Sequence, residues 1–464
     1  MVPLLSAYPG ARGYGHFLPL GGKSYLAVEY QSEANKYIYL WTAASDTDGN
    51  LYFPGMYSEN VSPTTNAAAI AYSKVPERTY SKVLLETGNA LYTSILFYAG
   101  DVDSSGNLYA VGYVNINGAV KAVVAKYNSS GVLQWQKRLG SSDASYFFGA
   151  KVAPNGKIYL SGYISDVGYN KVAVIQIDDA GAIQWQKYYW ADQNGSDSSI
   201  APAIDVDSDS NVYVGHYSYY FPGGSLIARN IVTKFNSSGT EQWSKQINPN
   251  GTSMKGLSVS SSNIVHVLYT SGGAPGYAYL ARLDTSGALT GNQRKIYGDN
   301  LEIWMGCDDE DGDIYLAGYN DFNSNPSVTD FKSVIIKYNS SSTIQWQRSL
   351  SWISSTYSEY SRISSKAKDV FTVTAYHGNP DYGNRNASLI ATLPKDGSKT
   401  GAYTVGTSPS FEYTYESSSL SESDATEEIT VSSFSNVYSS ASFSFVTLEG
   451  TDDTGFTSSV VKVI

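Results

Sequence analysis

The chain of 464 residues carries 42 acidic and 31 basic side chains, a formal net charge of −11 and a pI near 4.9. This balance, without any cluster of Lys and Arg among aromatic residues, argues against nucleic acid as a partner. No segment approaches the ~18 consecutive apolar residues of a membrane span, and the single cysteine, Cys307, cannot form an internal disulfide. We therefore expect a fold held by burial and hydrogen bonding, without a membrane partner.

The first 22 residues contain three prolines and five glycines and are expected to form an extended arm without a strand. They lack the basic head and apolar run of a secretory signal. An arm with exposed apolar side chains needs a place to dock, so we expect it to hold the protein to a neighbouring chain. The assembly residues of this arm are Leu4, Leu5, Tyr8, Tyr14 and Phe17.

Further along the chain, four stretches with a period near fifty residues are near-copies of one another, which is typical of a repeat architecture. They span 121–138, 171–187, 230–245 and 332–348, and their tryptophans are Trp135, Trp185, Trp243 and Trp346. A second motif precedes each stretch, and its anchor positions are Tyr52, Tyr109, Tyr159, Tyr213, Val265, Tyr315 and Phe371. A degenerate last copy at 427–434, followed by 441–464, extends the count to eight repeats.

Each repeat contains four segments with the residue types of β-strands; in the second repeat these are 95–101, 107–113, 121–127 and 132–139. The middle strands are apolar on both faces, whereas the fourth places Gln134, Gln136 and Arg138 on a side expected to face water. The fold class is therefore all-β, a single β-propeller of four-stranded blades. A strand-based solenoid is the alternative, but its coils need only about 20 to 30 residues.

Eight repeats predict eight blades, and the strand at 24–30 has no place in that count. If this strand closes the ring by completing a blade at the other end of the chain, seven blades are possible. The predicted division is an arm at 1–22 and a propeller at 23–464.

The string KYNSSGVLQWQK (126–137) resembles propeller repeats of bacterial secreted proteins and of structural proteins of marine tailed phages. The Gly-x-x-x-Trp spacing, as in Gly131 to Trp135, is similar to the repeat of quinoprotein dehydrogenases. That resemblance implies that the tryptophans tie blade to blade. The chain lacks the vicinal cysteines and the calcium-binding acidic cluster that a quinone enzyme would require, so we expect no cofactor.

Several motifs with possible chemistry have a simpler structural interpretation. Asp-x-Asp pairs such as Asp101/Asp103 and Asp205/Asp207 suggest calcium loops, but no glutamate follows at the twelfth position, so turns are favoured and no metal is expected. Of these acidic stretches, 308–313 is the best calcium candidate. The Asn-Ser-Ser triplets match a glycosylation acceptor and equally a hairpin turn, which is favoured. Four scattered histidines form no catalytic grouping, and no enzyme is predicted.

Three connections are longer than their counterparts in other repeats: 217–224, 319–331 and 376–387. Each follows the same strand of its repeat, so all three should reach one face of the ring, where propellers carry variable loops. We expect a binding rim for a glycan or a protein there. Its candidate residues are Tyr219, Tyr220, Phe221, Phe322, Tyr382 and Arg385.

A surface rich in Ser, Thr, Asn and Tyr, with only 16% charged residues, indicates a protein that works outside cells. With the resemblance, it predicts a non-enzymatic virion structural protein of a tailed phage, in a tail, fibre-associated or surface-decoration position. Its partners would be other virion proteins in an oligomeric assembly and a host surface glycan or protein. The alternative is a bacterial surface or secreted propeller acting as an adhesin or glycan-binding module; a polysaccharide lyase or glycosidase ranks third.

Overall fold

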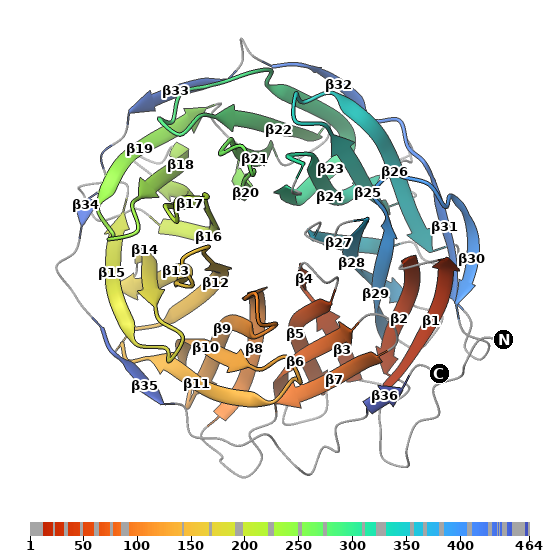
Figure 1. Ribbon diagram of the computed structural model, residues 1–464, viewed down its shortest axis with the longest axis horizontal. Coiled ribbons are helices and arrows are strands. Elements are labelled where there is room, and N and C mark those ends of the chain that lie inside the picture. Colours follow the sequence, from red (N-terminus) through yellow and green to blue (C-terminus); the bar gives the residue numbers. More distant parts are fainter. Residues whose placement is uncertain are drawn as a thin grey trace.

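The computed structural model is a β-propeller of seven antiparallel blades arranged in a ring (Figure 1). The prediction of a single all-β propeller is confirmed, and the blade number is seven. The structure describes residues 13–21, 24–31, 36–46, 50–59, 65–74, 78–84, 92–141, 143–166, 169–190, 198–220, 227–248, 253–271, 276–308, 311–321, 331–352, 357–364, 369–379, 385–405, 411–425, 429–433, 435, 437–438, 443–447 and 460–462. All elements in these ranges are strands.

Within each blade the chain runs from the innermost strand outward. Blade 1 contains β3 (Lys36–Leu40), β4 (Ala44–Ser45), β5 (Leu51–Glu59), β6 (Thr65–Lys74) and β7 (Arg78–Leu84); blade 2, β8 (Tyr92–Val102), β9 (Leu108–Ile116), β10 (Ala119–Tyr127) and β11 (Leu133–Leu139); blade 3, β12 (Ser145–Val152), β13 (Ile158–Asp166), β14 (Tyr169–Ile177) and β15 (Ile183–Trp190); and blade 4, β16 (Ser198–Val206), β17 (Val212–Tyr220), β18 (Ile227–Phe235) and β19 (Glu241–Asn248).

The long strand β23 (Arg294–Asp308) serves two blades. Its first part pairs with the third strand of blade 5, and its second part pairs with β24 as the innermost strand of blade 6. Blade 5 contains β20 (Ser253–Val259), β21 (Val265–Ser271), β22 (Gly276–Leu283) and the start of β23; blade 6, the rest of β23, β24 (Ile314–Asp321), β25 (Phe331–Tyr338) and β26 (Ile344–Trp352); and blade 7 begins with β27 (Tyr357–Ser364), β28 (Val370–Asn379) and β29 (Arg385–Pro394).

The N-terminal part of the chain completes blade 7. Strand β2 (Ser24–Gln31) pairs with β29, which confirms that the segment 24–30 closes the ring and reduces the blade number to seven. Strand β1 (Gly13–Gly21) then pairs with β2. The expectation that the first 22 residues carry no strand is therefore wrong for Gly13–Gly21, because their backbone completes a ladder despite the glycines. Of the predicted assembly residues, Tyr14 and Phe17 lie in β1, while Leu4, Leu5 and Tyr8 lie outside the described residues.

The C-terminal part of the chain runs backward around the outside of the ring (Figure 1). We call this segment, 401–464, the belt. After β30 (Gly401–Val405) it adds an antiparallel outer strand to each blade from 6 to 1 in turn. These are β31 (Phe411–Ser417) on β26, β32 (Ser421–Asp424) on β23, β33 (Thr430–Ser433) on β19, β34 (Val437–Tyr438) on β15, β35 (Phe445–Thr447) on β11 and β36 (Val460–Lys462) on β7.

The belt corrects the prediction of an eighth repeat. Its strand β33 falls in the segment 427–434 and pairs with blade 4 instead of starting a blade. The belt also covers the fourth strand of the blades, so the expectation that Gln136 faces water is wrong: this side chain is buried, whereas Gln134 is exposed. Short strands that pair with the edge of an existing sheet need only local β-propensity. The sequence pattern therefore does not distinguish them from the strands of a degenerate repeat.

Glutamine side chains that follow the repeat tryptophans hold the belt. The Gln186 amide donates to the Phe443 carbonyl at 3.1 Å and accepts from the Phe443 N–H at 3.0 Å. Gln347 makes the same pair of bonds with Leu420, at 3.0 and 2.8 Å. Apolar belt residues also enter the cores beside the blades: Leu420 and Ile429 are buried there, and Phe443 packs edge-on against Tyr188. The belt therefore binds through side chains as well as backbone.

The four repeat tryptophans occupy equivalent positions on the fourth strands of their blades, as predicted. Each indole N–H donates to a backbone carbonyl in the turn after the third strand of the next blade, which ties neighbouring blades together. The pairs are Trp135 with Asp179 (3.0 Å), Trp185 with Ser237 (3.2 Å), Trp243 with Thr285 (2.9 Å) and Trp346 with Lys395 (3.1 Å). The anchor residues of the second strands are also equivalent, and each is at most 2% exposed.

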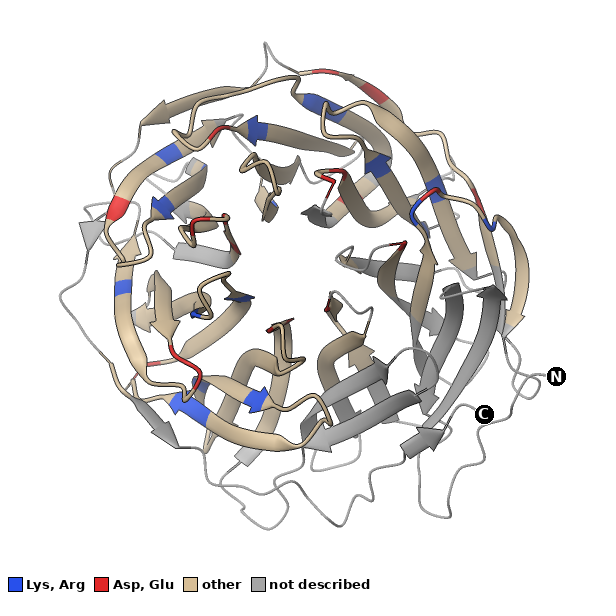
Figure 2. Ribbon diagram, in the orientation of Figure 1, with Lys and Arg blue, Asp and Glu red and all other residues tan. Residues whose placement is uncertain are grey.

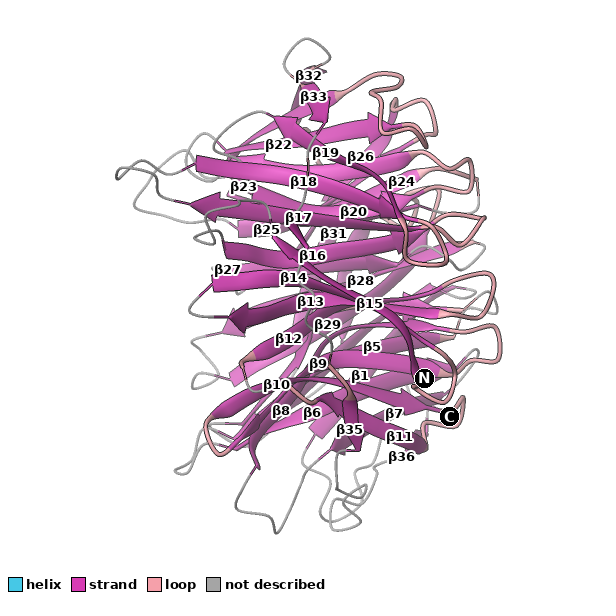
Figure 3. Ribbon diagram, turned by 90° about the vertical axis from the view of Figure 1, so that its left-hand side faces the viewer, coloured by secondary structure: helices cyan, strands magenta, loops and turns pink. Residues whose placement is uncertain are grey.

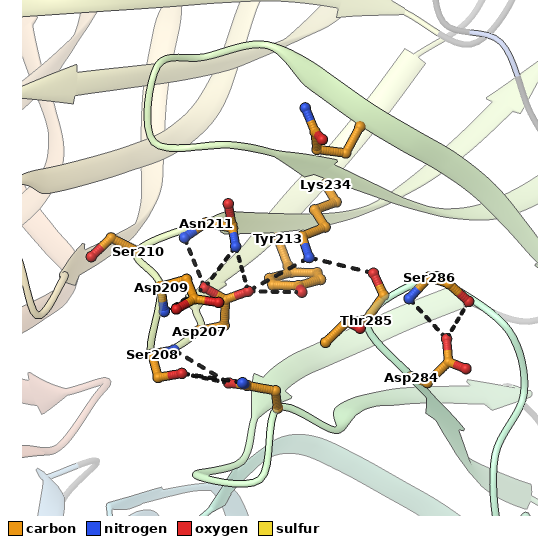
Figure 4. Close-up of polar contacts among 12 residues, drawn as sticks. Asp207, Ser208, Asp209, Ser210, Asn211, Tyr213, Lys234, Asp284, Thr285 and Ser286 are labelled. Carbon is orange, nitrogen blue, oxygen red and sulfur yellow. Dashed lines mark hydrogen bonds and ion pairs between the residues drawn. The ribbon is translucent and has the colours of Figure 1, made fainter.

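The tight turns between the first and second strands and between the third and fourth strands lie on one side of the ring, the turn face (Figure 3). Asp207 organises one of them: its carboxylate accepts from the Asn211 backbone N–H and side-chain amide, both at 2.8 Å, and from the Tyr213 hydroxyl at 3.0 Å, with Lys234 Nζ 3.6 Å away (Figure 4). Asp103 repeats this arrangement in blade 2. These contacts confirm that the Asp-x-Asp motif builds a turn.

The Asn-Ser-Ser triplets are likewise turns on this face. The Asn128 side-chain oxygen accepts from the backbone N–H groups of Ser130 and Val132, at 3.0 and 2.9 Å. Asn236 and Asn339 make the same two contacts in their blades. The side chain thus fixes the turn that joins the third and fourth strands.

Candidate functional site

The innermost strands surround a central cavity of about 930 Å³. Its wall is formed by β4, β8, β12, β16 and β20 and by the end of β27. Small-molecule sites typically occupy ~300–1,000 Å³, so this cavity is large enough to hold a ligand. The question is which side chains the ring directs into it.

A β-bulge in the innermost strand directs one extra side chain of the blade into the cavity. In blade 2, Gly112 pairs with Phe97 and the next register pair uses Ala99, so Tyr98 is the extra residue. In blade 3, the same shift makes Phe148 the extra residue. Both side chains line the cavity. Bulges are known to redirect side chains at functional sites.

In blades 2 and 3 the bulge leaves room only for glycine at the facing position of the second strand. A Cβ atom at Gly112 would lie 1.9 Å from the Leu96 carbonyl oxygen, and one at Gly162 would lie 1.8 Å from that of Tyr146. Neither position tolerates a side chain because the obstacle is backbone. The glycine of the repeated Gly-Tyr pair is therefore the sequence signature of the bulge.

Blades 5 and 6 also carry a register shift in the innermost strand; in blade 5 it lies opposite Leu268 and Tyr269, without the glycine. The extra residue of β20 is Lys255, which lines the cavity and forms an ion pair with Glu302 at 3.1 Å. The extra residue of β23 is Trp304. In blade 1, Trp41 lies in the break between β3 and β4, and its backbone N–H donates to the Pro54 carbonyl at 3.2 Å.

Aromatic residues of blades 1 to 3 gather beside this ring of bulges. They form a continuous set of partly exposed rings that we call the aromatic cluster: Tyr39, Trp41, Tyr98, Tyr113, Tyr146, Phe148 and Tyr163. Trp41 stacks on Tyr98 with 5.0 Å between ring centroids, and Tyr98 contacts Phe148 at 4.8 Å. The cluster lies in the halves of β9, β12 and β13 that are remote from the turn face.

The tyrosines of the cluster are hydrogen-bonding groups at neutral pH. Burial raises the pKa of Tyr98 well above its usual value, and the neighbouring Tyr113 and Tyr146 raise it further. Burial also raises the pKa of Tyr113 and of Tyr146. Their hydroxyls therefore remain protonated, and can both donate and accept.

The carboxylates near the cavity hold neighbouring blades together. Asp101 accepts from the Val152 N–H at 3.0 Å, which ties blade 2 to blade 3. Asp205 accepts from the Val259 N–H at 2.9 Å and pairs with Lys151 at 3.1 Å, which ties blades 3, 4 and 5. Figure 2 shows further acidic residues at innermost turns around the centre. These contacts give the carboxylates a structural role.

The rim residues predicted from the long connections lie only partly in described segments. Tyr219 and Tyr220 end β17, and Arg385 begins β29. Phe221, Phe322 and Tyr382 lie outside the described residues. The strands β17, β24 and β28 all end on the face opposite the turn face, so the three connections start on one face; the rim itself stays a prediction.

Sequence reasoning missed the aromatic cluster. Its tyrosines Tyr113 and Tyr163 stand four positions after the anchors Tyr109 and Tyr159, inside the repeated strings AVGY and LSGY. The recurrence of Gly-Tyr was a usable signal, because glycine inside a strand indicates a bulge or a close backbone approach. Trp41 carries no such signal, since blade 1 is the least regular copy.

Blade 4 departs from this pattern, since His216 occupies the position of Gly112 and Gly162. It is fully buried, its ring is 5.6 Å from that of Tyr189, and neither ring nitrogen has a hydrogen-bond partner among the described residues. Burial lowers the pKa of His216 to about 3. The folded protein therefore holds this side chain neutral far below the ~6.5 of an exposed histidine.

We expect His216 to make the protein sensitive to acid. In the unfolded chain this histidine binds a proton near pH 6.5, whereas in the folded chain it stays neutral. The contribution of His216 to the free energy of unfolding is therefore fully present above pH 6.5 and is lost as the pH drops toward about 3. Between pH 7.5 and 5 the loss is roughly 2 kcal/mol, at ~1.4 kcal/mol per pH unit. Urea unfolding of wild type and His216→Leu at both pH values measures it. A variant as acid-sensitive as wild type would contradict the assignment.

The fold and the cavity together define the chain as a seven-bladed β-propeller, closed by both chain ends around a cavity walled partly by aromatic residues. No protein-family model and no curated protein sequence matches it. Among the described residues, no three His, Cys, Asp or Glu side chains lie close enough to hold a metal ion, and no helix could cross a membrane.

Solved structures that match this chain at low sequence identity include the following three. A protein of unknown function from Dyadobacter fermentans is 11% identical, with a TM-score of 0.44 over 78% of this chain and 96% of that one. The polysaccharide lyase Uly1 is 10% identical, with a TM-score of 0.40 over 67% and 93%. Sqt1 from Chaetomium thermophilum is 11% identical, with a TM-score of 0.38 over 78% and 99%. Similarity at this level carries no argument about function.

Proposed function

We propose that this protein is a non-enzymatic virion component of a tailed phage, in a tail, fibre-associated or surface-decoration position, and that its propeller is an interaction platform. The observation that carries this proposal is the double closure of the ring. Strand β2 completes blade 7, and the belt crosses the other six blades. A protein that functions outside the cell without disulfides depends on slow unfolding, and closure from both ends supports such kinetic stability.

The cavity supports binding as the task of the platform. Its wall combines Tyr98 and Phe148 of the aromatic cluster with carboxylates that are engaged in joining strands, such as Asp101 and Asp205. Fixed aromatic surface favours recognition of a partner, and a general acid or base would instead need a carboxyl group directed at the ligand. The partners would be other virion proteins and a component of the host surface.

The second candidate is a bacterial surface or secreted propeller that acts as an adhesin or glycan-binding module. The aromatic cluster favours it equally, because ligand binding is the same in either setting. The two candidates differ in where the protein is found. Localisation therefore separates them without any knowledge of the ligand.

Immunogold electron microscopy tests the proposal. Antibodies raised against the purified full chain would be applied to phage particles and to cells from a culture that carries the gene. We expect gold at a constant position on the particles, with an antibody to an unrelated cytoplasmic protein as control. Gold on cell envelopes alone supports the adhesin, and gold on neither contradicts both candidates.

A further inference from the structure

The ring of bulges is a device for presenting side chains to the cavity. The register shift recurs in β8, β12, β20 and β23, and each time an extra residue is pushed out of the ladder. A glycine on the second strand makes room for this backbone in blades 1, 2, 3 and 6. In blades 2, 3 and 5 the extra residues Tyr98, Phe148 and Lys255 line the cavity.

Aromatic side chains of blades 1 to 3 form one partly exposed surface, of which Tyr98 and Phe148 line the cavity. Trp41, Tyr98 and Phe148 contact one another in sequence, with centroids 5.0 and 4.8 Å apart. All three are only partly buried, unlike the anchor residues one strand further out. Soluble proteins rarely leave adjoining apolar rings open to water unless a ligand covers them.

We propose that the central cavity binds the end of a neutral carbohydrate chain, stacked on the aromatic cluster. This inference rests on the proposed function as a binding platform and names the class of its ligand. A sugar ring has an apolar C–H face that packs on an aromatic ring, and hydroxyl groups at its edge that need hydrogen-bond partners. At the cavity wall Tyr98 and Phe148 offer aromatic rings, and Tyr98 also carries a protonated hydroxyl.

The charges of the wall favour a neutral ligand over an anionic one. Asp46, Asp101, Asp103, Asp205 and Asp207 line the cavity, against the cations Lys151 and Lys255. Phosphate or nucleic acid would meet this net negative wall and be repelled.

A cationic or a purely apolar ligand fits the wall less well. Asp205 is already paired with Lys151, and the other wall carboxylates, such as Asp101 and Asp207, accept hydrogen bonds from the backbone, so a cation would have to compete with these contacts. A purely apolar ligand would cover the Lys255–Glu302 pair and the tyrosine hydroxyls without offering them hydrogen bonds, which is unfavourable. A polyhydroxylated neutral ligand satisfies both the rings and the polar groups.

The aromatic rings lie at one end of the cavity, whose wall extends to turn residues such as Ser104 and Ser208. The cluster lies toward the face opposite the turn face, where β17, β24 and β28 end. The cavity volume of about 930 Å³ accommodates a short oligosaccharide end.

Saturation-transfer NMR on the full chain tests the proposal, with maltohexaose, cellohexaose, mannohexaose and xylohexaose as separate probes. We expect transfer to the C–H protons of at least one probe, and a dissociation constant raised about tenfold or more by Tyr98→Ala and by Phe148→Ala. Tyr169→Ala is the matched control, since this tyrosine is 40% exposed and belongs to β14 outside the cluster. Circular dichroism confirms that each variant is folded, and Tyr98→Phe should retain binding if Tyr98→Ala does not fold.

Three results would overturn the inference: no transfer to any of the four probes, binding unchanged in both cluster variants, or a hexalysine peptide whose binding depends on Tyr98 and Phe148. The outcome is separable from that of immunogold labelling. If particles are labelled but the protein binds no carbohydrate, the proposed function as a binding platform stands and the carbohydrate inference is wrong. If the protein binds carbohydrate but neither particles nor cell envelopes are labelled, both proposed functions are wrong and the carbohydrate site stands.

Discussion

A chain that ends at Thr400, and therefore lacks the whole belt, is expected to be recovered mainly as insoluble protein. Its loss removes the outer partner of β7, β11, β15, β19, β23 and β26. It also withdraws Leu420, Ile429 and Phe443 from the cores beside the blades, and burial of such side chains contributes ~1.5–3 kcal/mol each. The ordering of the belt offsets part of this gain, but the exposed edges and apolar surface favour aggregation.

Graded truncation and complementation make this prediction specific. A chain that ends at Glu449 loses only β36 and should remain soluble, with the smallest change in its thermal midpoint. Co-expression of residues 401–464 as a separate chain should restore soluble protein and co-purify with the truncated ring. A soluble Thr400 truncation whose thermal midpoint equals that of the full chain would show that the belt is dispensable.

Leu420→Asp is the corresponding point substitution. It places a carboxylate in the core lined by Leu268, Leu280 and Ile296 while the backbone of the belt stays intact. Burial of an unpaired charge is strongly unfavourable, so we expect the belt to detach locally at blades 5 and 6. Limited proteolysis should then cut the segment between β31 and β33 before any other part of the chain.

The repeats made the propeller predictable, because local sequence and global fold agree wherever a motif recurs. Tyr109, Tyr159 and Tyr213 fill the same core position in each blade, and their common spacing sets the second strands. The tryptophans Trp135 and Trp185 were predictable for the same reason. Periodicity reports interactions that every blade repeats, and these are the contacts within blades and between neighbouring blades.

The belt and the aromatic cluster are not repeated interactions, and periodicity does not reveal them. The short strands of the belt have ordinary β-propensity, so in sequence they resemble a degenerate repeat. Their positions are set by pairing with the outer strands of blades that other parts of the chain form. Gln136 is buried and Gln186 and Gln347 are half-buried beside the belt, but each occupies a position that the sequence pattern assigns to solvent. The cluster combines residues from three blades at different positions, of which only the Gly-Tyr pairs recur.

Substitution of Trp185 by alanine is expected to lower the free energy of unfolding by roughly 3 to 5 kcal/mol. Its indole lies between Tyr159 and Phe235, with centroids at 5.8 and 6.1 Å, and its N–H donates to the Ser237 carbonyl. The next blade also approaches its face: a Cβ atom at Gly239 would lie 2.7 Å from the ring. For a chain of this length the change corresponds to a midpoint lower by roughly 3 to 5 °C.

Controls on the same strand and in the next blade separate the blade contact from general damage. Gln184→Ala alters an exposed neighbour of Trp185 and should leave the midpoint unchanged within about 1 °C. Gly239→Ala should destabilise the wild type, because a methyl group there meets the indole and the backbone φ of +77° disfavours a side chain.

A double-mutant cycle isolates the contact itself. In the Trp185→Ala background the steric part of the Gly239→Ala effect disappears, and only the backbone part remains, so the two substitutions together should destabilise less than the sum of their separate effects. Additive effects would show that the indole does not rest on the next blade, and an unchanged midpoint for Trp185→Ala would place that ring on a binding surface instead. Since the same indole-on-glycine contact recurs at Trp243 with Gly287 and at Trp346 with Gly397, the coupling measured at one blade junction should be reproduced at the others.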